Sequence, residues 1–527
     1  MRLTEDGIVF GPATPALATV IPFPSPVGPH VFPLLIPGRP LVEGEQYRFH
    51  FNMTKCIGCR SCEVACNEQN GNPADILWRR IGELEAGSYP ATQRHYLSMG
   101  CNHCLDAECV KGCPVDAYTK DPVTGIVLHS ADACIGCQYC VWNCPYSVPQ
   151  FNPERGVVGK CDMCKGRLED GFEPACVNAC PESAIEIEIV NMETWRENYS
   201  GAESPGMPSA VHTISTTRIT LPENTESALE RVDGGQIHPE HAHLSLVLMT
   251  TLMQAVAGAY IVLLLHHGLD TVRLGLLLMV AGIALAISTM HLGRPAYAWR
   301  ALKMWRRSWL SREVLLFTLF LCALTTTSIS TAAIQFHHTL YVGFLPGLEW
   351  LTAALGLAGN LASAYIYLVP ARPSWNMRHT PVDFVLTGTF LGALLAAVLC
   401  ELPQVFLSST PFAEQPSPLV AGWLATLLAA ASALAWLLNQ GLRLYRLRSS
   451  KLFEARATFS LLSGAMLRRR ATASFVLVPL SVLILASGHP LPALAVGWAA
   501  ALLARYLFFV SVVPLNMALT FVRTRSA

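Results

Sequence analysis

The chain of 527 residues carries little charge for its length. Only 14% of its residues are charged, whereas 52% are hydrophobic and the mean hydropathy is +0.37. This balance excludes a single water-soluble globule. Acidic residues are scarcest in the second half, because only seven of the 37 Asp and Glu residues follow residue 240. Twenty of the 37 Lys and Arg residues lie there. The net charge of zero therefore combines an acidic first half with an apolar, basic second half.

Two other features are missing. No basic stripe with interleaved aromatic residues runs through the first half, so we expect no nucleic-acid partner. No continuous apolar stretch follows Met1, and Glu5 and Asp6 come directly after the first residues. We therefore expect neither a signal peptide nor a twin-arginine signal. Residues 1–45 are interpreted as a Pro-rich extension, either an extended arm or a disordered leader.

Cysteine is almost absent outside one segment. Sixteen of the 18 cysteines lie between Cys56 and Cys180, and the other two, Cys322 and Cys400, lie in apolar stretches typical of a helix core. So dense a segment indicates either disulfides or metal ligands. Disulfides need an oxidising compartment, which the expected lack of an export signal does not favour.

The sixteen cysteines form four groups. They are Cys56, Cys59, Cys62 and Cys66; Cys101, Cys104, Cys109 and Cys113; Cys134, Cys137, Cys140 and Cys144; and Cys161, Cys164, Cys176 and Cys180. The first and third groups follow the C-x2-C-x2-C-x3-C spacing of bacterial ferredoxins. Three thiolates in such a loop hold one cubane, and the fourth ligates the other cluster of a pair. The alternative is structural zinc, but zinc ribbons use two separated pairs of cysteines. The spacing predicts four [4Fe–4S] clusters.

The second half reads as a membrane domain. Residues 196–240 are polar without an apolar period and are predicted to be a linker. Residues 241–527 then contain apolar runs long enough to span a bilayer. We predict an all-α bundle of eight spans at 244–268, 272–292, 313–335, 347–370, 382–402, 418–440, 471–488 and 491–513. Only His489 and Pro490 separate the last two, and a seven-span count would put the two ends of this domain on opposite sides.

The loops of this domain indicate its orientation. With eight spans, eighteen of the twenty Lys and Arg residues fall on the side that also carries the cysteine segment. The opposite loops contribute only Arg273. Because positive loops stay in the cytoplasm, we expect the cysteine domain on the cytoplasmic face of a bacterial inner membrane. A reducing cytosol leaves metal as the role of the cysteines.

The four groups, in this order, resemble the iron–sulfur subunit of DMSO-reductase-type molybdoenzymes. The stretches Gly100-Cys-Asn-His-Cys104 and Lys160-Cys-Asp-Met-Cys164 strengthen the resemblance, which covers residues 46–195, although Asn67 replaces the usual Pro after Cys66. It implies an α+β domain like two fused bacterial ferredoxins. It also implies that the groups pair first with fourth and second with third. The implied ligand sets are Cys56, Cys59, Cys62 with Cys180; Cys161, Cys164, Cys176 with Cys66; Cys101, Cys104, Cys109 with Cys144; and Cys134, Cys137, Cys140 with Cys113.

Residues 241–520 are similar to the membrane-anchor subunit of the same enzymes, on the stretch Met290-His-Leu-Gly-Arg-Pro295 and the stretch around Glu313. That similarity implies eight spans, electron exchange with quinone and no haem. Quinone chemistry moves protons, so an ionisable group near the interface is needed. His291, Arg294 and Glu313 are the candidates, although each could simply be an interfacial side chain. Asp383 and Arg505 lie within spans and are expected to pair.

The cysteine domain and the anchor account for the whole chain, leaving no room for a pterin-binding domain. We expect a non-catalytic redox subunit, with the chemistry on a separate molybdenum or tungsten bis-pterin partner. Electrons would pass through four clusters to or from menaquinone or ubiquinone. The cytoplasmic orientation favours a sulfite-oxidising complex. A quinol-dependent reductase of DMSO or polysulfide, or a redox conduit without a molybdenum partner, is the alternative.

Overall fold

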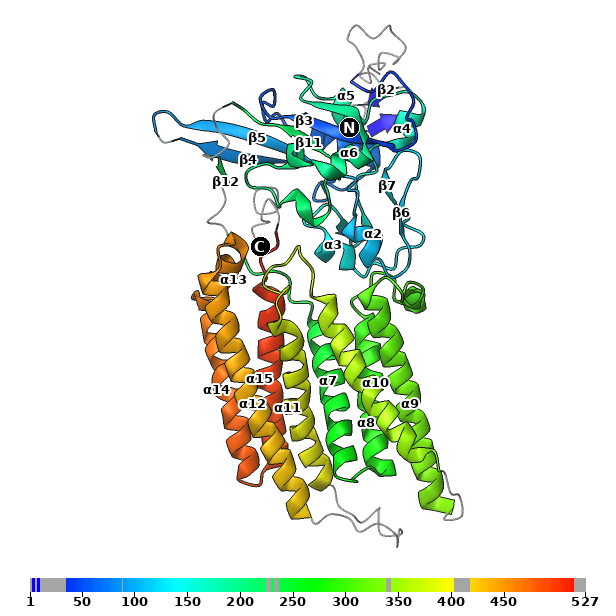
Figure 1. Ribbon diagram of the computed structural model, residues 1–527, viewed down its shortest axis with the longest axis vertical. Coiled ribbons are helices and arrows are strands. Elements are labelled where there is room, and N and C mark those ends of the chain that lie inside the picture. The colour runs from blue at the N-terminus through cyan, green and yellow to red at the C-terminus, as the bar shows by residue number, and fades with distance from the viewer. Residues whose placement is uncertain are drawn as a thin grey trace.

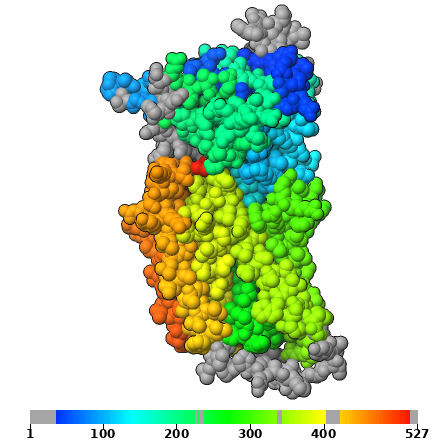
Figure 2. Space-filling model, in the orientation of Figure 1, coloured from blue at the N-terminus to red at the C-terminus, as the bar shows by residue number. Residues whose placement is uncertain are grey.

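The computed structural model describes residues 2–4, 7–9, 35–87, 89–223, 229–231, 237–337, 343–401 and 418–515. It has two parts, a mixed domain of short helices and strands and a bundle of long helices (Figure 1). In the space-filling view the mixed domain rests directly on one end of the bundle (Figure 2). Most of the predicted Pro-rich extension, residues 10–34, lies outside the described residues. Its first residues form a short hairpin of β1 (Arg2–Thr4) and β2 (Gly7–Val9).

A three-stranded sheet closes the mixed domain by joining its two ends. β3 (Glu45–Asn52) pairs antiparallel with β10 (Ile185–Asn191), so that Phe49 lies opposite Ile187. The side chains alternate along both strands, as strand geometry requires. Phe49, Phe51 and Ile187 enter the core, while Glu186 and Glu188 of β10 point to the other face.

The third strand of this sheet corrects one prediction. β11 (Arg218–Thr220) lies within the segment predicted to be a linker, yet it pairs in parallel with β3. Ahead of it, the backbone amides of Leu105 and Asp106 donate to the carbonyls of Ile214 and Thr213. Residues 196–222 therefore belong to the cysteine domain. Their buried contacts use backbone and hydroxyl groups, which leave no apolar period in the sequence.

The remaining strands form small sheets that bracket the cysteine loops. β4 (Arg80–Ala86) pairs with β5 (Gln93–Met99) and with β12 (Glu230–Arg231). Two hairpins follow, β6 (Tyr118–Lys120) with β7 (Val127–His129), and β8 (Gln150–Asn152) with β9 (Val157–Gly159). The helices are short: α1 (Ser61–Asn70), α2 (Glu108–Gly112), α3 (Tyr139–Asn143), α4 (Lys165–Glu169), α5 (Ala175–Asn178) and α6 (Met192–Glu197), with 3-10 turns at Ser200–Ala202 and Ala210–His212.

Among the described residues, the second part contains eight long helices, as predicted. They are α7 (Leu244–Leu265), α8 (Thr271–Thr289), α9 (Trp309–His337), α10 (Leu345–Ile366), α11 (His379–Glu401), α12 (Pro418–Ser449), α14 (Arg468–Ala486) and α15 (Pro490–Val510). A 3-10 segment, η3 (Pro295–Leu302), and a shorter helix, α13 (Phe453–Ser463), lie at the end nearer the cysteine domain (Figure 1). Within the described residues, seven of the long helices are long and apolar enough to cross a membrane.

The exception is α10, whose Glu349 and Asn360 lower its mean hydropathy. It nevertheless runs the length of the bundle. α9 begins where Ser308 bonds the cysteine domain, and α10 ends at Tyr367, whose ring packs 6.0 Å from that of Trp142 in the same domain. The end of α9 and the start of α10 lie at the other end of the bundle (Figure 1). α10 is thus an eighth long helix that runs beside the seven candidate spans.

Both ends of the bundle sequence meet the cysteine domain. His243, just before α7, and Phe509, at the end of α15, both pack against the ring of Trp142. At His489 and Pro490 the described structure has two helices, because α14 ends at Ala486 and α15 begins at Pro490.

Candidate metal centres and membrane pocket

Two small cavities in the mixed domain are each lined by four cysteines. One is lined by Cys56, Cys59, Cys62 and Cys180. The other is lined by Cys101, Cys104, Cys109 and Cys144, together with Thr213 from the segment predicted to be a linker. In both sets three cysteines come from one group of the sequence and the fourth from its partner group. Sets crossed between groups are a property of paired ferredoxin clusters, not of zinc ribbons.

The other eight cysteines also gather in crossed sets. Burial raises the pKa of the Cys137 thiol to about 12, and the charges of Cys113 and Cys134 add to the rise. Burial likewise raises the pKa of the Cys66 thiol to about 12, with Cys176 and Cys164 adding to it. Cys66 therefore lies with the fourth group of the sequence and Cys113 with the third.

The chemistry of these donors fits a bound metal centre. All sixteen thiols are free and unbridged by disulfides. Clustered, buried thiols keep their protons because charge is costly in such surroundings. They become thiolate ligands only when a cationic metal centre replaces the protons. The crossed sets of four cysteines match the ligands of [4Fe–4S] clusters.

A buried arginine that belongs to none of the predicted motifs lies between two of these sets. Arg79 is 2% exposed, and its Nη1 atom donates to Ser98 at 3.1 Å. Thiolate charge on Cys176 and Cys62, which belong to different sets, raises the pKa of Arg79 against the lowering effect of burial. A fixed positive charge here favours added electrons in either centre. The signal available in the sequence was a pair of arginines, Arg79 and Arg80, at the start of a strand.

The anchor contributes directly to one cysteine loop. The backbone amides of Gly293 and Arg294 donate to the carbonyls of Gly136 and Ile135, at 3.4 and 3.1 Å. A Cβ atom on Gly293 would lie 2.1 Å from the carbonyl oxygen of Gly156, so only glycine allows this approach. The loop around Gly136 carries Cys134 and Cys137, whose set is thereby held against the bundle.

A cavity of about 340 Å³ lies where this loop meets the bundle. Its lining combines Cys137, Tyr139 and Trp142 of the cysteine domain with residues of α7, α8, α9 and the end of α10. The two predicted residues His291 and Glu313 both line it. A cavity of this size, mostly apolar with a few polar groups, is typical of a site for a small organic molecule.

The polar groups of this cavity are suited to proton transfer. Burial lowers the pKa of His291 to about 4, so its imidazole is neutral at pH 7. Its Nδ1 atom is buried without a hydrogen-bond partner among the described residues. Glu313 is only 4% exposed. Neither side chain is an interfacial residue turned to water.

The third predicted residue of the site lies elsewhere. Arg294 does not line the cavity, and its Nη1 atom instead donates to the carbonyl of Ala131 at 2.9 Å. The contact of Arg294 with quinone therefore stays a prediction, and the cavity does not include this side chain. Its side chain faces the cysteine domain because its own backbone is hydrogen-bonded to Ile135. Tyr367, which no motif in the sequence singles out, lines the cavity in its place.

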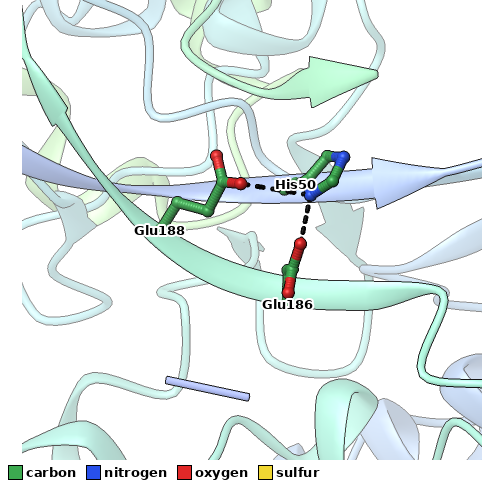
Figure 3. A group of neighbouring side chains, drawn as sticks. All are labelled: His50, Glu186 and Glu188. Atoms are coloured by element: carbon green, nitrogen blue, oxygen red, sulfur yellow. Dashed lines mark hydrogen bonds and ion pairs between the residues drawn. The ribbon is translucent and has the colours of Figure 1, made fainter. Parts of the chain in front are cut away.

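Two other clusters of charge are structural. His50 lies between Glu186 and Glu188 on the outer face of the sheet (Figure 3), an arrangement that could hold a metal ion. Arg48 also binds Glu188, at 2.8 Å, and Arg218 binds the same carboxylate. These cations already neutralise Glu188, while Glu186 pairs with His50. The hydrogen bonds of His50 and Arg218 and the charge of Arg48 lower the pKa of Glu188 against the opposing effect of burial. The group is an ion-pair network.

The second charged cluster lies within the bundle, where Asp383 and Arg505 pair as expected. Their side chains are 3.5 Å apart. The indole of Trp436 donates to Asp383 at 2.8 Å, and Arg505 donates to Gln254 at 3.2 Å. Buried charges in a membrane domain are tolerated when they are paired in this way.

Comparison with known proteins covers both halves of the chain. Residues 92–189 match the family model of the 4Fe-4S dicluster domain, and residues 237–486 match that of the DMSO reductase anchor subunit. The B subunit of the anaerobic dimethyl sulfoxide reductase of Haemophilus influenzae is 34% identical over 187 residues, which cover 34% of this chain and 87% of that protein.

Two proteins of Escherichia coli K12 are similar over the same half. A subunit of a probable anaerobic dimethyl sulfoxide reductase is 40% identical over 168 residues, 30% of this chain and 82% of its own length. The iron–sulfur subunit of formate dehydrogenase-O is 37% identical over 151 residues, 25% of this chain and 50% of its own length.

Proposed function

Because this chain belongs to the DMSO reductase family, as an iron–sulfur subunit fused to a membrane anchor, we propose that it transfers electrons between a separate catalytic subunit and membrane quinone. The observation that carries the proposal is the cavity at the junction of the two parts. It brings Cys137, a cluster ligand in this proposal, to the same wall as His291 and Glu313. The catalytic partner is a molybdenum or tungsten bis-pterin enzyme.

The cysteine domain holds four [4Fe–4S] clusters in this proposal, which supply one-electron carriers along the domain. Their ligands are the four crossed sets described above. The set of Cys134, Cys137, Cys140 and Cys113 is the one next to the membrane cavity. Iron analysis of the purified chain tests the count. We expect about sixteen irons per chain, four per cubane; about four zinc ions and no iron would overturn it.

The cavity binds the quinone headgroup in this proposal. The neutral imidazole of His291 hydrogen-bonds one quinone oxygen, and Glu313 exchanges the proton at the membrane interface. Replacement of His291 by alanine tests the site. We expect loss of quinone-coupled turnover with unchanged cluster spectra, because the cluster ligands are untouched. Turnover equal to that of the unaltered protein would remove His291 from the site.

The clusters face the cytoplasm of a bacterial inner membrane in this proposal. The support is that the cysteine domain contacts the arginine-rich side of the bundle, through Arg294, Arg300 and Arg307 among others. The chain enters and leaves the bundle on that side. A reporter enzyme fused to the C-terminus should therefore be active only in the cytoplasm. A fusion active only in the periplasm would reverse the orientation.

The substrate of the complex follows from that orientation. A cytoplasmic cluster domain favours oxidation of sulfite with reduction of menaquinone or ubiquinone. The second candidate is a reductase of DMSO or a similar acceptor, which the names of the relatives favour. Purification of the complex with its catalytic subunit decides between them. Sulfite-dependent quinone reduction supports the first, and quinol-dependent reduction of DMSO or polysulfide the second. A chain that reacts with quinone but purifies without a molybdenum partner would contradict both.

A further inference from the structure

A second cavity, of about 470 Å³, lies among α12, α13, α14 and α15. Most of its wall is apolar, with Trp436, Phe459, Phe475 and Leu507 among the lining residues. No cysteine lines it, and the ring of Phe508 stands between it and Tyr367 of the junction cavity. This cavity therefore has no part in the proposed redox function.

The charged groups of this cavity gather at the end nearer the cysteine domain. Arg443 lies near the end of α12 and Arg468 at the start of α14, and both of these ends are on the side of the bundle nearer the cysteine domain (Figure 1). The buried Ser511, just past the end of α15, also lines the cavity. The cavity thus combines an apolar wall with two arginines at the end nearer the cysteine domain.

Arg443 is buried but incompletely bonded. It is 8% exposed, its Nη2 atom makes one long hydrogen bond of 3.4 Å to the carbonyl of Ser374, and its Nε atom has no partner among the described residues. The hydroxyl of Ser511 is likewise buried without a described partner. Unbonded polar groups of this kind cost free energy unless a ligand satisfies them.

No carboxylate within the described part of the chain neutralises Arg443. The nearest acidic residue, Asp383, already pairs with Arg505 and accepts from Trp436. Of the two buried arginines in this region, Arg505 is the one paired with Asp383, and the charge of Arg443 has no carboxylate partner among the described residues. A buried, unpaired positive charge in a membrane domain is costly, and a bound anion would remove that cost.

We propose that this cavity binds an anionic glycerophospholipid. Its phosphate group lies between Arg443 and Arg468, with Ser511 donating a further hydrogen bond, and its acyl chains follow the apolar wall of α12 and α14. Basic pockets between spans at the cytoplasmic side are suited to such headgroups. A quinone fits less well, because no His, Asp, Glu or Tyr lines the cavity to exchange a proton.

Lipid analysis of the purified complex tests the proposal. The complex is purified in mild detergent, washed with excess detergent and analysed for phosphorus and by mass spectrometry. We expect about one tightly held anionic phospholipid per chain. In detergent, added phosphatidylglycerol should raise the thermal stability of the washed complex more than phosphatidylcholine does.

Substitutions of the two arginines locate the site. Arg443→Gln removes the buried charge and should weaken phosphatidylglycerol binding about tenfold or more, since a charge-assisted bond is lost. Arg443→Lys keeps the charge and should retain part of the binding. Arg468 is exposed, so Arg468→Gln should not disturb folding. This variant therefore tests lipid binding even if Arg443→Gln, which changes a buried residue, fails to assemble.

Two control variants complete the test. Arg469→Gln alters a neighbouring arginine that does not line the cavity and should bind lipid normally. His291→Ala alters the junction cavity and should also leave lipid binding unchanged, so this result is independent of the proposed redox function. Equal lipid retention by Arg443→Gln, Arg468→Gln and the unaltered protein would overturn the proposal. So would retention of phosphatidylcholine as strongly as phosphatidylglycerol, or recovery of quinone in place of lipid.

Discussion

At the scale of single residues, the function depends on cysteines that are far apart in the sequence. Cys144 lies four residues from Cys140 and yet lines the cavity of Cys101, Cys104 and Cys109. Local sequence alone would assign it to the nearer set. The ferredoxin spacing explains the exchange, because the fourth cysteine follows a helical turn and points away from the loop of the first three.

This crossed arrangement predicts the effect of removing one ligand. Cys144→Ser should abolish the same cluster signal in electron paramagnetic resonance as Cys101→Ser, with a loss of about a quarter of the iron. Cys134→Ser should abolish a different signal. If Cys144→Ser instead removed the signal that Cys134→Ser removes, the assignment of the two sets would be wrong.

A second residue-scale prediction concerns pH. Burial lowers the pKa of His291 to about 4, below its unfolded value near 6.5, so the unfolded chain binds the proton more readily. Above pH 6.5 both states are neutral at His291, and the free energy of unfolding is unaffected by it. As the pH falls from 6.5 toward 4, the unfolded chain takes up the proton first, so the free energy of unfolding decreases. We expect a loss of about 1–2 kcal/mol between pH 7 and pH 5.

Thermal unfolding across this pH range, compared with His291→Gln, measures that loss. Glutamine is of similar size and does not titrate, so the variant should lose less stability on acidification. Identical slopes for the two proteins would show that folding does not shift the pKa of His291.

At the scale of elements, the bundle is organised around α7. In the membrane window of this helix 89% of the residues are buried, far more than in α8 or α14. α7 packs closely on α11, where Gly258 faces Gly388 and Gly392. Small residues allow helix backbones to approach in this way inside a membrane. The hydropathy of α7 predicts a span, but not that this span lies in the centre.

This close approach predicts a strong effect of a small substitution. A Cβ atom on Gly258 would lie 2.0 Å from the carbonyl oxygen of Gly388, so Gly258→Ala must push the helices apart. We expect a loss of about 1–3 kcal/mol in stability, typical of overpacking. Gly275→Ala on α8 is a matched control, because nothing lies within 4 Å of its Cβ position. Thermal unfolding in detergent should separate the two variants, and equal melting temperatures would contradict the close packing.

At the scale of the whole molecule, the proposed function requires a fixed position of the cysteine domain relative to the helix bundle. Gly293 of the anchor contacts both Gly136 and Gly156 of the cysteine domain. Fusion in one chain keeps the halves together, but this contact sets the distance between the loop of Cys137 and the junction cavity. In the proposed function, a small displacement there would lengthen the path of the electron without changing either half.

Gly293→Ala tests this dependence. The added methyl group must displace the cysteine domain, and we expect quinone-coupled turnover to fall between about ten- and a hundredfold. Cluster spectra should not change, because no ligand moves within its own loop. Gly166→Ala, in the cysteine domain but with open space at its Cβ position, should have normal turnover. Normal turnover in Gly293→Ala would mean that the contact does not control electron transfer.

Prediction from the sequence was most successful for features that depend on short segments of the chain. The spacing of each cysteine group and the length of each apolar run predicted the iron–sulfur domain and the eight helices. Interpretation failed where local pattern and fold diverge. Residues 196–222 looked like a linker because their contacts use hydroxyl and backbone groups. For Arg294, the structure adds contacts that no local pattern shows: its backbone amide donates to Ile135 and its side chain donates to Ala131.

The sequence by itself therefore determined that this chain joins a cysteine-rich redox domain to a membrane bundle, since ligand spacing and hydropathy are properties of short segments. Only the tertiary structure decided what lies at their junction. The cavity that combines Cys137 with Glu313 and Tyr367, like the pair of Asp383 and Arg505, joins residues more than a hundred positions apart. Helix packing, rather than any repeat along the chain, brings such residues together.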